Sequence, residues 1–217
     1  LSRLRELDVA LMTCEKIRLQ AAASSGKLTV PEQVETLLQK LRGEELDACL
    51  RKADLSVVTK TLAQLNVWLH ERPLAPNLAD KKIRKFIGKR LCEWSQKLEN
   101  IDRKYPDFHN MLELHQIRIK VKRFRYALQT LPEVPRDSNL LRRLKRLQDM
   151  LGFLHDDFIN AKLVQCFLVD SGNVELRYEA GLFAGWERAK AEAAVELLPQ
   201  LWEDFCGALS SWRKENL

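Results

Sequence analysis

The sequence predicts an all-α protein built from antiparallel helices joined by short turns. Apolar residues recur every three or four positions along most of the chain, a spacing typical of helices that are buried on one side. No stretch of useful length alternates between apolar and polar residues as a half-buried strand does. Only eight glycines and seven prolines occur in 217 residues, and the content of Leu, Ala, Glu, Lys and Arg favours helices.

Helix boundaries are predicted from prolines, glycines and short polar side chains. In the first part of the chain, helices are predicted over residues 1–23, ended by Ser24-Ser25-Gly26, over 31–43 and over 44–52. A fourth helix is capped by Asp54 or Ser56 and ended by Pro73 and Pro76, and a fifth covers 79–103. The next helix is capped by Asp107 and ended by Pro132 and Pro135, a long one capped by Asp137 or Ser138 covers 139–169, and the last covers 174–212. Gly43 is predicted to break the second helix, and Pro199 to interrupt or kink the last.

Apolar faces within these segments predict the core. Trp68 is predicted to be a core residue or a packing anchor. The segment 79–103 has the apolar stripe Ile83, Phe86, Ile87, Leu91, Trp94 and Leu98. The long helix that follows Asp137 has the core face Leu141, Leu144, Leu147, Leu151, Leu154 and Phe158.

Composition limits the class of protein. No stretch approaches the length of a membrane span, and no signal peptide is evident. The five cysteines are scattered and odd in number, without CxxC or paired Cys/His spacing. That pattern argues for reduced, mostly buried thiols in a cytoplasmic protein, and against a disulfide framework or a structural zinc site.

Positive charge is concentrated in the middle of the chain. The whole chain has a net charge of +6, but residues 80–146 contain 19 Lys/Arg against 8 Asp/Glu, a balance of +11. Residues 147–217 contain 6 against 12, and residues 1–79 contain 11 against 10. This asymmetry indicates a localised site for an anion.

The stretch 114–131, LHQIRIKVKRFRYALQTL, separates on a helical wheel into two stripes. The apolar stripe consists of Leu114, Ile117, Val121, Phe124, Leu128 and Leu131. Beside it lies a second stripe of polar side chains, His115, Arg118, Lys122 and Arg125. No acidic residue occurs between Arg118 and Glu133, so this charge must be neutralised by other helices or by an anionic ligand. The alternative is a solvated basic face on a bundle helix.

Further basic residues occur at helical spacing on either side of this stretch. Lys82, Lys85 and Lys89 form a stripe on the preceding segment. On the following segment Arg142 and Arg146 share a sector with Asp149, Gly152, Asp156 and Asn160. These cations could extend an anion site, with ordinary surface charge as the competing interpretation.

Catalytic chemistry has little support in the sequence. His115 has no carboxylate within four residues on its stripe to orient it as a general base. The other histidines show no metal-ligand spacing, the acids do not cluster, and no phosphate-binding loop occurs. Cations at helical spacing are better suited to holding phosphates than to cleaving them, since Arg binds phosphate oxygens bidentately and Lys acts as a point charge. We therefore expect no catalytic residue, no cofactor and no metal.

A resemblance to a known family rests on two motifs. His115-Gln-Ile-Arg118-Ile-Lys-Val-Lys122-Arg123-Phe-Arg125-Tyr, followed by Leu147-Gln-Asp-Met-Leu151-Gly-x-Leu-x-Asp156, resembles the second half of the CHAD family, the conserved histidine α-helical domain. Leu4-Arg-Glu-Leu-Asp-Val9 resembles the acidic helix of that family's first half, and it matches 154–159 within the chain. The resemblance implies one domain over 1–217, with two pseudo-repeated helical halves, roughly 1–105 and 106–217, around a basic central channel.

The resemblance also implies that the channel binds inorganic polyphosphate or another linear polyanion. The binding residues carried over by motif position are His115, Arg118, Lys122, Arg123 and Arg125, to which stripe geometry adds Lys82, Lys85, Lys89, Arg142 and Arg146. Members of the family begin with a first basic helix that has its own His-x-x-Arg, and that helix does not occur among the residues of this sequence. Such domains also occur behind a triphosphate-hydrolysing domain, which would precede Leu1. We expect a cytoplasmic location, with association with polyphosphate granules.

Two alternatives to polyphosphate binding stay open. A nucleic-acid-binding helical domain would also attract a polyanion, but no recognition motif is present and most aromatics fall in apolar stripes. A phosphotransfer bundle would use His115 as phosphoacceptor, although nothing in the sequence identifies a docking partner. We rank polyphosphate binding first, nucleic acid second and phosphotransfer third, and expect no membrane partner.

Overall fold

A computed structural model describes residues 2–23, 29–71, 76–130, 137–170 and 172–216 of the chain. In these ranges the protein contains seven α-helices and no strand, which confirms the predicted all-α fold. The helices are α1 (Ser2–Ala23), α2 (Glu32–Lys52), α3 (Leu55–Glu71), α4 (Pro76–Asp102), α5 (Met111–Thr130), α6 (Ser138–Asp170) and α7 (Val174–Asn216). The predicted helix ends at Ser24-Ser25-Gly26, Pro73, Pro132 and Pro135 lie outside the described residues.

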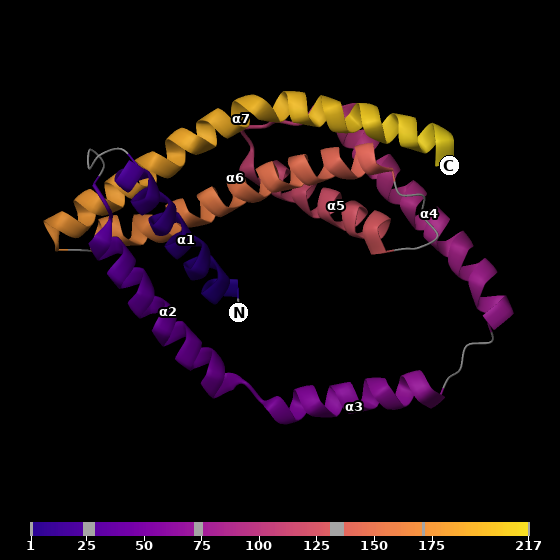
Figure 1. Cartoon of the computed structure of the whole chain (residues 1–217), viewed down its shortest axis with the longest axis horizontal. Coiled ribbons are helices and arrows are strands. Elements are labelled where there is room, and N and C mark those ends of the chain that lie inside the picture. Colours follow the sequence, from indigo (N-terminus) through magenta and orange to yellow (C-terminus); the bar gives the residue numbers. More distant parts are fainter. Residues whose placement is uncertain (1, 24–28, 72–75, 131–136, 171, 217) are drawn as a thin grey trace.

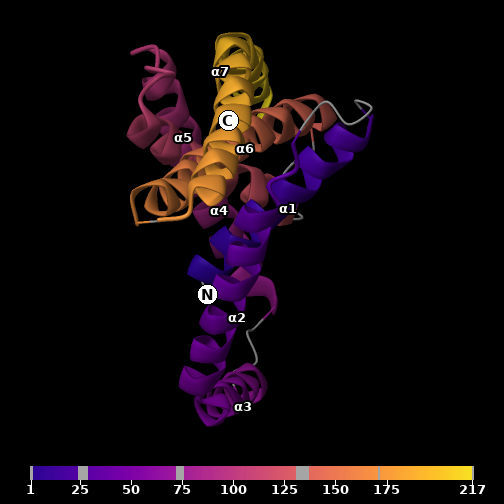
Figure 2. The ribbon, with the colours of Figure 1, turned by 90° about the vertical axis from the view of Figure 1, so that its left-hand side faces the viewer.

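The long helices α6 and α7 lie side by side and form the spine of the molecule (Figure 1). Helices α4 and α5 pack against one part of this pair, and α1 and α2 pack against the other. Helix α3 stands apart from the rest at the far end of α2, as both ribbon views show (Figures 1 and 2). The bundle is therefore open on one side rather than closed around a single core.

The main core is formed by α4, α5, the first half of α6 and the second half of α7. Its largest fully buried side chains are Phe124, Trp202, Phe205 and Trp212. Phe124 meets Trp212 edge to face, with ring centroids 5.6 Å apart. Burial of each such side chain contributes roughly 1.5–3 kcal/mol, so this core holds α5 in one orientation.

A second, smaller core joins α1 and α2 to the end of α6 and the beginning of α7. Here Glu179 of α7 is buried, and its Oε2 accepts the backbone N–H groups of Gln33 at 2.7 Å and Val34 at 3.1 Å. Pro31 at the N-cap of α2 offers no side-chain cap, so a carboxylate from another helix satisfies these donors instead. Since α6 and α7 take part in both cores, the cores do not follow the predicted division at residues 105 and 106, and that division stays a prediction.

Several predicted boundaries are confirmed and several are wrong. The predicted caps Asp54 and Asp137 accept backbone N–H groups at the starts of α3 and α6. Helix α2 continues through Gly43, because good helix formers on both sides outweigh a glycine cost of about 1 kcal/mol. Helix α7 runs through Pro199 without the predicted interruption, with Leu198 and Trp202 buried on either side, and a kink at Pro199 stays a prediction.

Two other boundaries also differ from prediction. Pro76 is the first residue of α4 rather than a terminator of α3, because its fixed φ suits the first helical position. Asp107 does not cap α5: its Oδ1 accepts the N–H of His109 in the preceding turn. The cap is Asn110, whose Oδ1 accepts the N–H groups of Leu112 and Glu113 at 3.1 and 3.2 Å.

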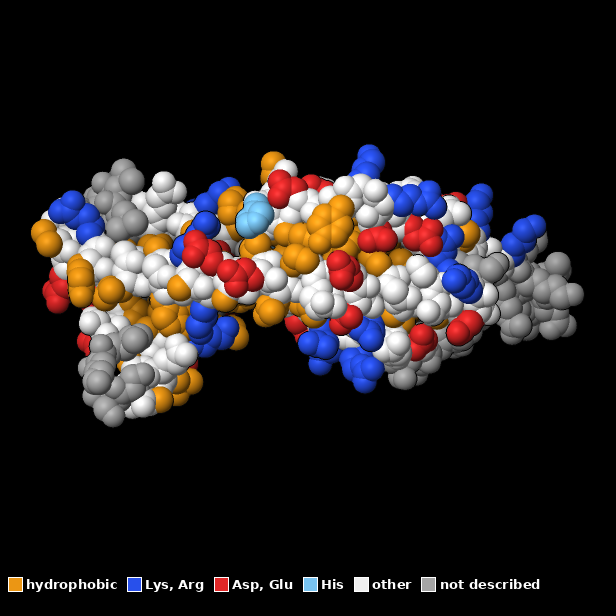
Figure 3. Space-filling model, turned by 90° about the horizontal axis from the view of Figure 1, so that it is seen from above, with side chains coloured by type: hydrophobic (Ala, Val, Ile, Leu, Met, Phe, Trp, Pro, Cys, Tyr) orange, Lys and Arg blue, Asp and Glu red, His pale blue; other side chains and the backbone are white. Residues whose placement is uncertain are grey.

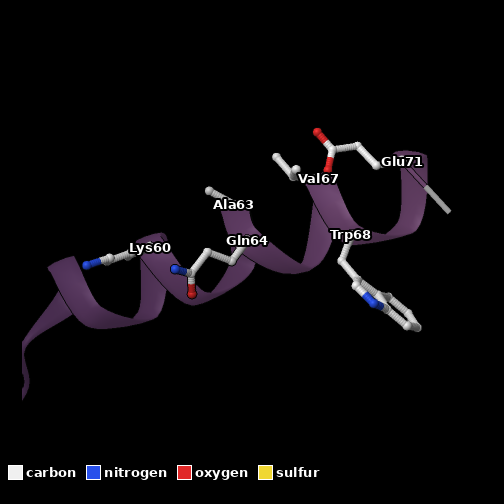
Figure 4. Close-up of a pocket in the computed structure, with 6 residues that line it drawn as sticks. All are labelled: Lys60, Ala63, Gln64, Val67, Trp68 and Glu71. Atoms are coloured by element: carbon white, nitrogen blue, oxygen red, sulfur yellow. The ribbon is translucent and has the colours of Figure 1, made fainter.

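Helix α3 has an apolar face that no described residue covers. Trp68, predicted to be a core or packing residue, is instead 54% exposed, and the hollow beside it is lined by α3 alone (Figure 4). Phe86, predicted to lie on the apolar stripe of α4, is 59% exposed. Periodicity identified apolar faces correctly at both places, but it did not determine whether a partner lies against them.

The five cysteines are free thiols, but the prediction that most of them are buried is wrong, since Cys49 and Cys92 are half-buried and Cys166 is exposed. Cys14 and Cys206 are buried, and burial raises the pKa of the Cys14 thiol to about 12. These two side chains therefore act as small apolar core groups rather than as nucleophiles.

Candidate functional site

Helix α5 is fixed by its apolar face. Five of its side chains are at most 3% exposed and contact the main core: Leu114, Ile117, Val121, Phe124 and Leu128. The side chains of the neighbouring stripe, His115, Arg118 and Arg125, are half-buried at the edge of that face, and Lys122 is exposed. The core thus places a row of basic groups along the margin of the helix, as the sequence predicted.

The cations of α5 form no ion pair within the described part of the chain. Arginines elsewhere do pair with carboxylates, namely Arg3, Arg18, Arg42, Arg90, Arg143, Arg188 and Arg213. On α5, by contrast, the Nζ of Lys122 lies over the ring of Tyr126 at 5.7 Å, and the buried Nε of Arg125 has no described hydrogen-bond partner. The positive charge of this helix is therefore not neutralised by its described neighbours.

Helix α6 meets the stripe of α5 at two places one turn apart. A Cβ built on Gly152 would lie 4.0 Å from the Nε of Arg118, so the guanidinium group lies against the backbone of α6. The imidazole rings of His115 and His155 pack together with centroids 4.8 Å apart and planes inclined by 33°. His115, Arg118 and His155 therefore occupy one shared surface where α5 meets α6.

Two carboxylates act on this surface from a distance. Burial, together with the charge of Arg118 and the neighbouring His115, lowers the pKa of His155 below its usual value. Asp156 on α6 and Glu6 on α1 oppose that shift. The lowering causes outweigh these two carboxylates, so the surroundings of His155 favour its neutral ring in the free protein.

The other predicted site residues have no described side-chain contact with His115, Arg118 or His155. Lys85 and Lys89 are exposed on α4, which packs against α5, and the Lys82 side chain lies outside those described. Arg142 is exposed and donates to the side chain of Asn139. Arg146 lines a groove between α6 and α7, away from any described contact with α5.

The face dominated by α7 shows no concentration of positive charge. Among its described side chains, acidic and basic groups are interspersed with apolar ones (Figure 3). This mixture agrees with the acidic balance of residues 147–217. The unpaired basic groups of α5 are thus a local feature rather than part of a uniformly positive surface.

His155 and Gly152 are the site residues that the sequence did not single out as ligands. Gly152 was noted on the stripe of α6, and His155 follows it by three residues, which places both toward the same side of the helix. The spacing was visible, but the contact with His115 depends on how α5 and α6 meet. A pattern on one helix does not contain that information.

A second polar cluster lies deeper, between α1, α6 and α7. The side-chain amide of Asn160 is 1% exposed and donates to Thr13 Oγ1 at 3.3 Å and Glu187 Oε2 at 2.9 Å. Burial raises the pKa of Glu187, and burial with the nearby Glu187 charge raises that of Asp157 to about 6. These groups link three helices, because Thr13 lies on α1, Asn160 on α6 and Glu187 on α7.

The described part of the chain offers neither a metal site nor a membrane-spanning helix. The described residues contain no group of three or more His, Cys, Asp or Glu side chains arranged to hold a metal ion. None of the described helices combines the length and apolarity needed to cross a membrane.

The fold and the site together define an α-helical domain with an unpaired basic helix packed at its centre against a histidine-bearing partner helix. The family model of the CHAD domain matches residues 1–165, about three quarters of the chain, so the protein belongs to the CHAD domain family. This family is linked to polyphosphate binding in general. A search of curated proteins and a search of solved structures each found no match.

Proposed function

We propose that this protein binds inorganic polyphosphate at the surface where α5 meets α6, without hydrolysing it. The observation that supports this most directly is the row of α5 cations that form no ion pair in the described chain. Leaving several like charges unpaired on one helix costs stability, and a linear anion with regularly spaced negative charges removes that cost. Family membership supports the same ligand.

The binding residues in this proposal begin with the α5 stripe, His115, Arg118, Lys122 and Arg125, together with Arg123. In this proposal Lys85 and Lys89 of α4 and Arg142 of α6 extend it into a Lys/Arg-lined channel. Lys82, whose side chain lies outside those described, and Arg146, which lines the groove between α6 and α7, stay predictions. The role fits a cytoplasmic protein that associates with polyphosphate granules. It also fits an accessory domain beside a triphosphate-hydrolysing domain.

Polyphosphate suits this surface better than nucleic acid does. Single-stranded nucleic acids gain much of their affinity from bases stacked on aromatic rings. On α5 the exposed aromatic side chain is Tyr126, which already has the Lys122 ammonium over its ring. Phosphotransfer through Nδ1 of His115 is disfavoured because that nitrogen is buried.

The test is a binding series with long-chain polyphosphate, triphosphate, single-stranded RNA and duplex DNA at matched salt. Polyphosphate should bind more tightly than RNA of equal charge. With about four phosphate contacts and a slope of about −0.7 per contact, affinity should fall roughly 50-fold between 50 and 200 mM salt. Equal or tighter binding of RNA would favour the nucleic-acid function instead.

The absence of hydrolysis is tested separately. Incubation of the chain with triphosphate or polyphosphate, with and without magnesium, should release no phosphate, because no carboxylate set for a catalytic metal is described. Reproducible turnover that disappears in His115→Ala would overturn this part of the proposal and favour an enzyme.

A further inference from the structure

The packing of His155 against His115 places a second imidazole on the proposed binding surface. The two rings come from different helices and lie 4.8 Å apart, close enough that each lies within reach of any group bound by the other. Arg118 acts on His155 by its charge and lies against α6 one turn away, at Gly152. Three nitrogen-bearing groups thus converge on one place.

Protonation of His155 is unfavourable in this arrangement. Arg118 is a permanent cation, and a protonated His155 would place a second positive charge beside it in a half-buried position. The groups acting on His155 from the packed helices are Glu6 of α1, His115 and Arg118 of α5, and its neighbour Asp156 on α6. The two carboxylates do not fully compensate, so an added anion would stabilise the protonated His155 ring.

We infer that His155 is a further anion-binding residue and that its ring takes up a proton when a phosphate group of polyphosphate binds next to His115 and Arg118. This inference rests on the proposed function and specifies the chemistry of the same site. A neutral imidazole offers one N–H donor, whereas the protonated ring offers two and a positive charge. Protonation therefore converts His155 from a weak ligand into a strong one.

The pH dependence has a definite sign. In the free protein, burial and the charge of Arg118 hold the pKa of His155 below its usual value, which favours the neutral ring. A bound phosphate raises that pKa, because its negative charge favours the charged ring. Binding is then accompanied by proton uptake, and affinity increases as the pH falls from 7.5 to 5.5. Internal phosphoryl groups of a long polyphosphate keep one negative charge each over this range, so the ligand adds little dependence of its own.

The experiment measures affinity for long-chain polyphosphate by calorimetry at pH 5.5, 6.5 and 7.5 and constant ionic strength, with the full chain. Wild-type protein should bind about tenfold more tightly at pH 5.5 than at pH 7.5. His155→Gln should reduce this ratio at least threefold. His155→Arg, a permanent cation, should bind at pH 7.5 at least as tightly as wild type and should also show a weaker pH dependence.

His70→Gln is the matched control, because it removes an exposed imidazole on α3, whose Nδ1 lies 2.8 Å from the Asn66 carbonyl oxygen. It should retain the wild-type pH dependence. Repeating the titration in buffers with different ionisation enthalpies should show proton uptake in wild type that decreases in both His155 variants. Circular dichroism confirms that each variant is folded.

The outcomes separate the two proposals. Normal binding with no pH dependence, or a pH dependence that both His155 variants retain, would overturn this inference and leave the proposed function intact. No binding of polyphosphate at any of the three pH values would reject the proposed function and the inference with it. If His155→Gln does not fold, His155→Arg and the proton-uptake measurement on wild type still decide the question.

Discussion

Replacing Arg118 with alanine distinguishes a binding site from a diffuse positive surface. Arg118 is half-buried beside Gly152 of α6, and its guanidinium forms no ion pair in the described chain. Lys120 lies on the same helix but about half a turn away around its axis, outside the stripe. Both substitutions to alanine remove one positive charge, so any difference between them reports position rather than net charge.

The expected magnitudes follow from these contacts. Because Arg118 has no described ionic partner to lose, Arg118→Ala should change the free energy of unfolding by no more than ~0.5 kcal/mol. Loss of a charge-assisted hydrogen bond to phosphate costs roughly 1.5–3 kcal/mol, which weakens polyphosphate binding by about 10-fold to 150-fold. Removing the charge of Arg118 should also allow the pKa of His155 to rise toward its usual value.

Three measurements check this prediction: polyphosphate affinity by calorimetry, unfolding in urea, and the titration of the His155 ring by NMR. Lys120→Ala should weaken binding by less than about threefold, an effect of diffuse electrostatics. If both variants weaken binding equally, the stripe of α5 is not a site. An unchanged His155 titration in Arg118→Ala would show that the guanidinium does not act on that ring, and would refute the placement of Arg118 and His155 on one shared surface.

Three further predictions concern the scaffold. Glu179→Ala should destabilise the protein by about 1–3 kcal/mol in urea unfolding, because it leaves two backbone N–H groups at the start of α2 without their acceptor; no loss of stability would show that water replaces the carboxylate. For Asp157, whose folded-state pKa of about 6 exceeds its unfolded value near 3.8, stability should fall as the pH rises through that window. Asp157→Asn should therefore gain about 1–2 kcal/mol at pH 7.5 and less at pH 4, and a variant that is less stable at pH 7.5 would contradict this. Trp202→Ala should cost about 3–5 kcal/mol of unfolding free energy, whereas Trp68→Ala should cost less than ~0.5 kcal/mol because its ring is exposed; comparable losses would mean that α3 is packed in solution.

The sequence alone determined the helical content and the two-sided character of α5. Helical periodicity depends on residues three or four positions apart, which are neighbours whatever the rest of the chain does. For the same reason the caps Asp54 and Asp137 could be predicted, since a cap contacts backbone groups two or three residues away. Where local signals competed, prediction failed, as when Gly43 was expected to break α2.

Only the tertiary structure decided what lies against each helix. Trp68 and Phe86 occupy apolar faces by periodicity, yet both are exposed, because an apolar face is buried only if another element covers it. His115 and His155 are 40 positions apart in the sequence, and their contact exists because the main core fixes the position of α5 against α6. The absence of described ion pairs on the α5 cations was likewise decided by the tertiary structure. The sequence shows that no carboxylate follows them closely, but only packing determines that no described carboxylate from another helix reaches them either.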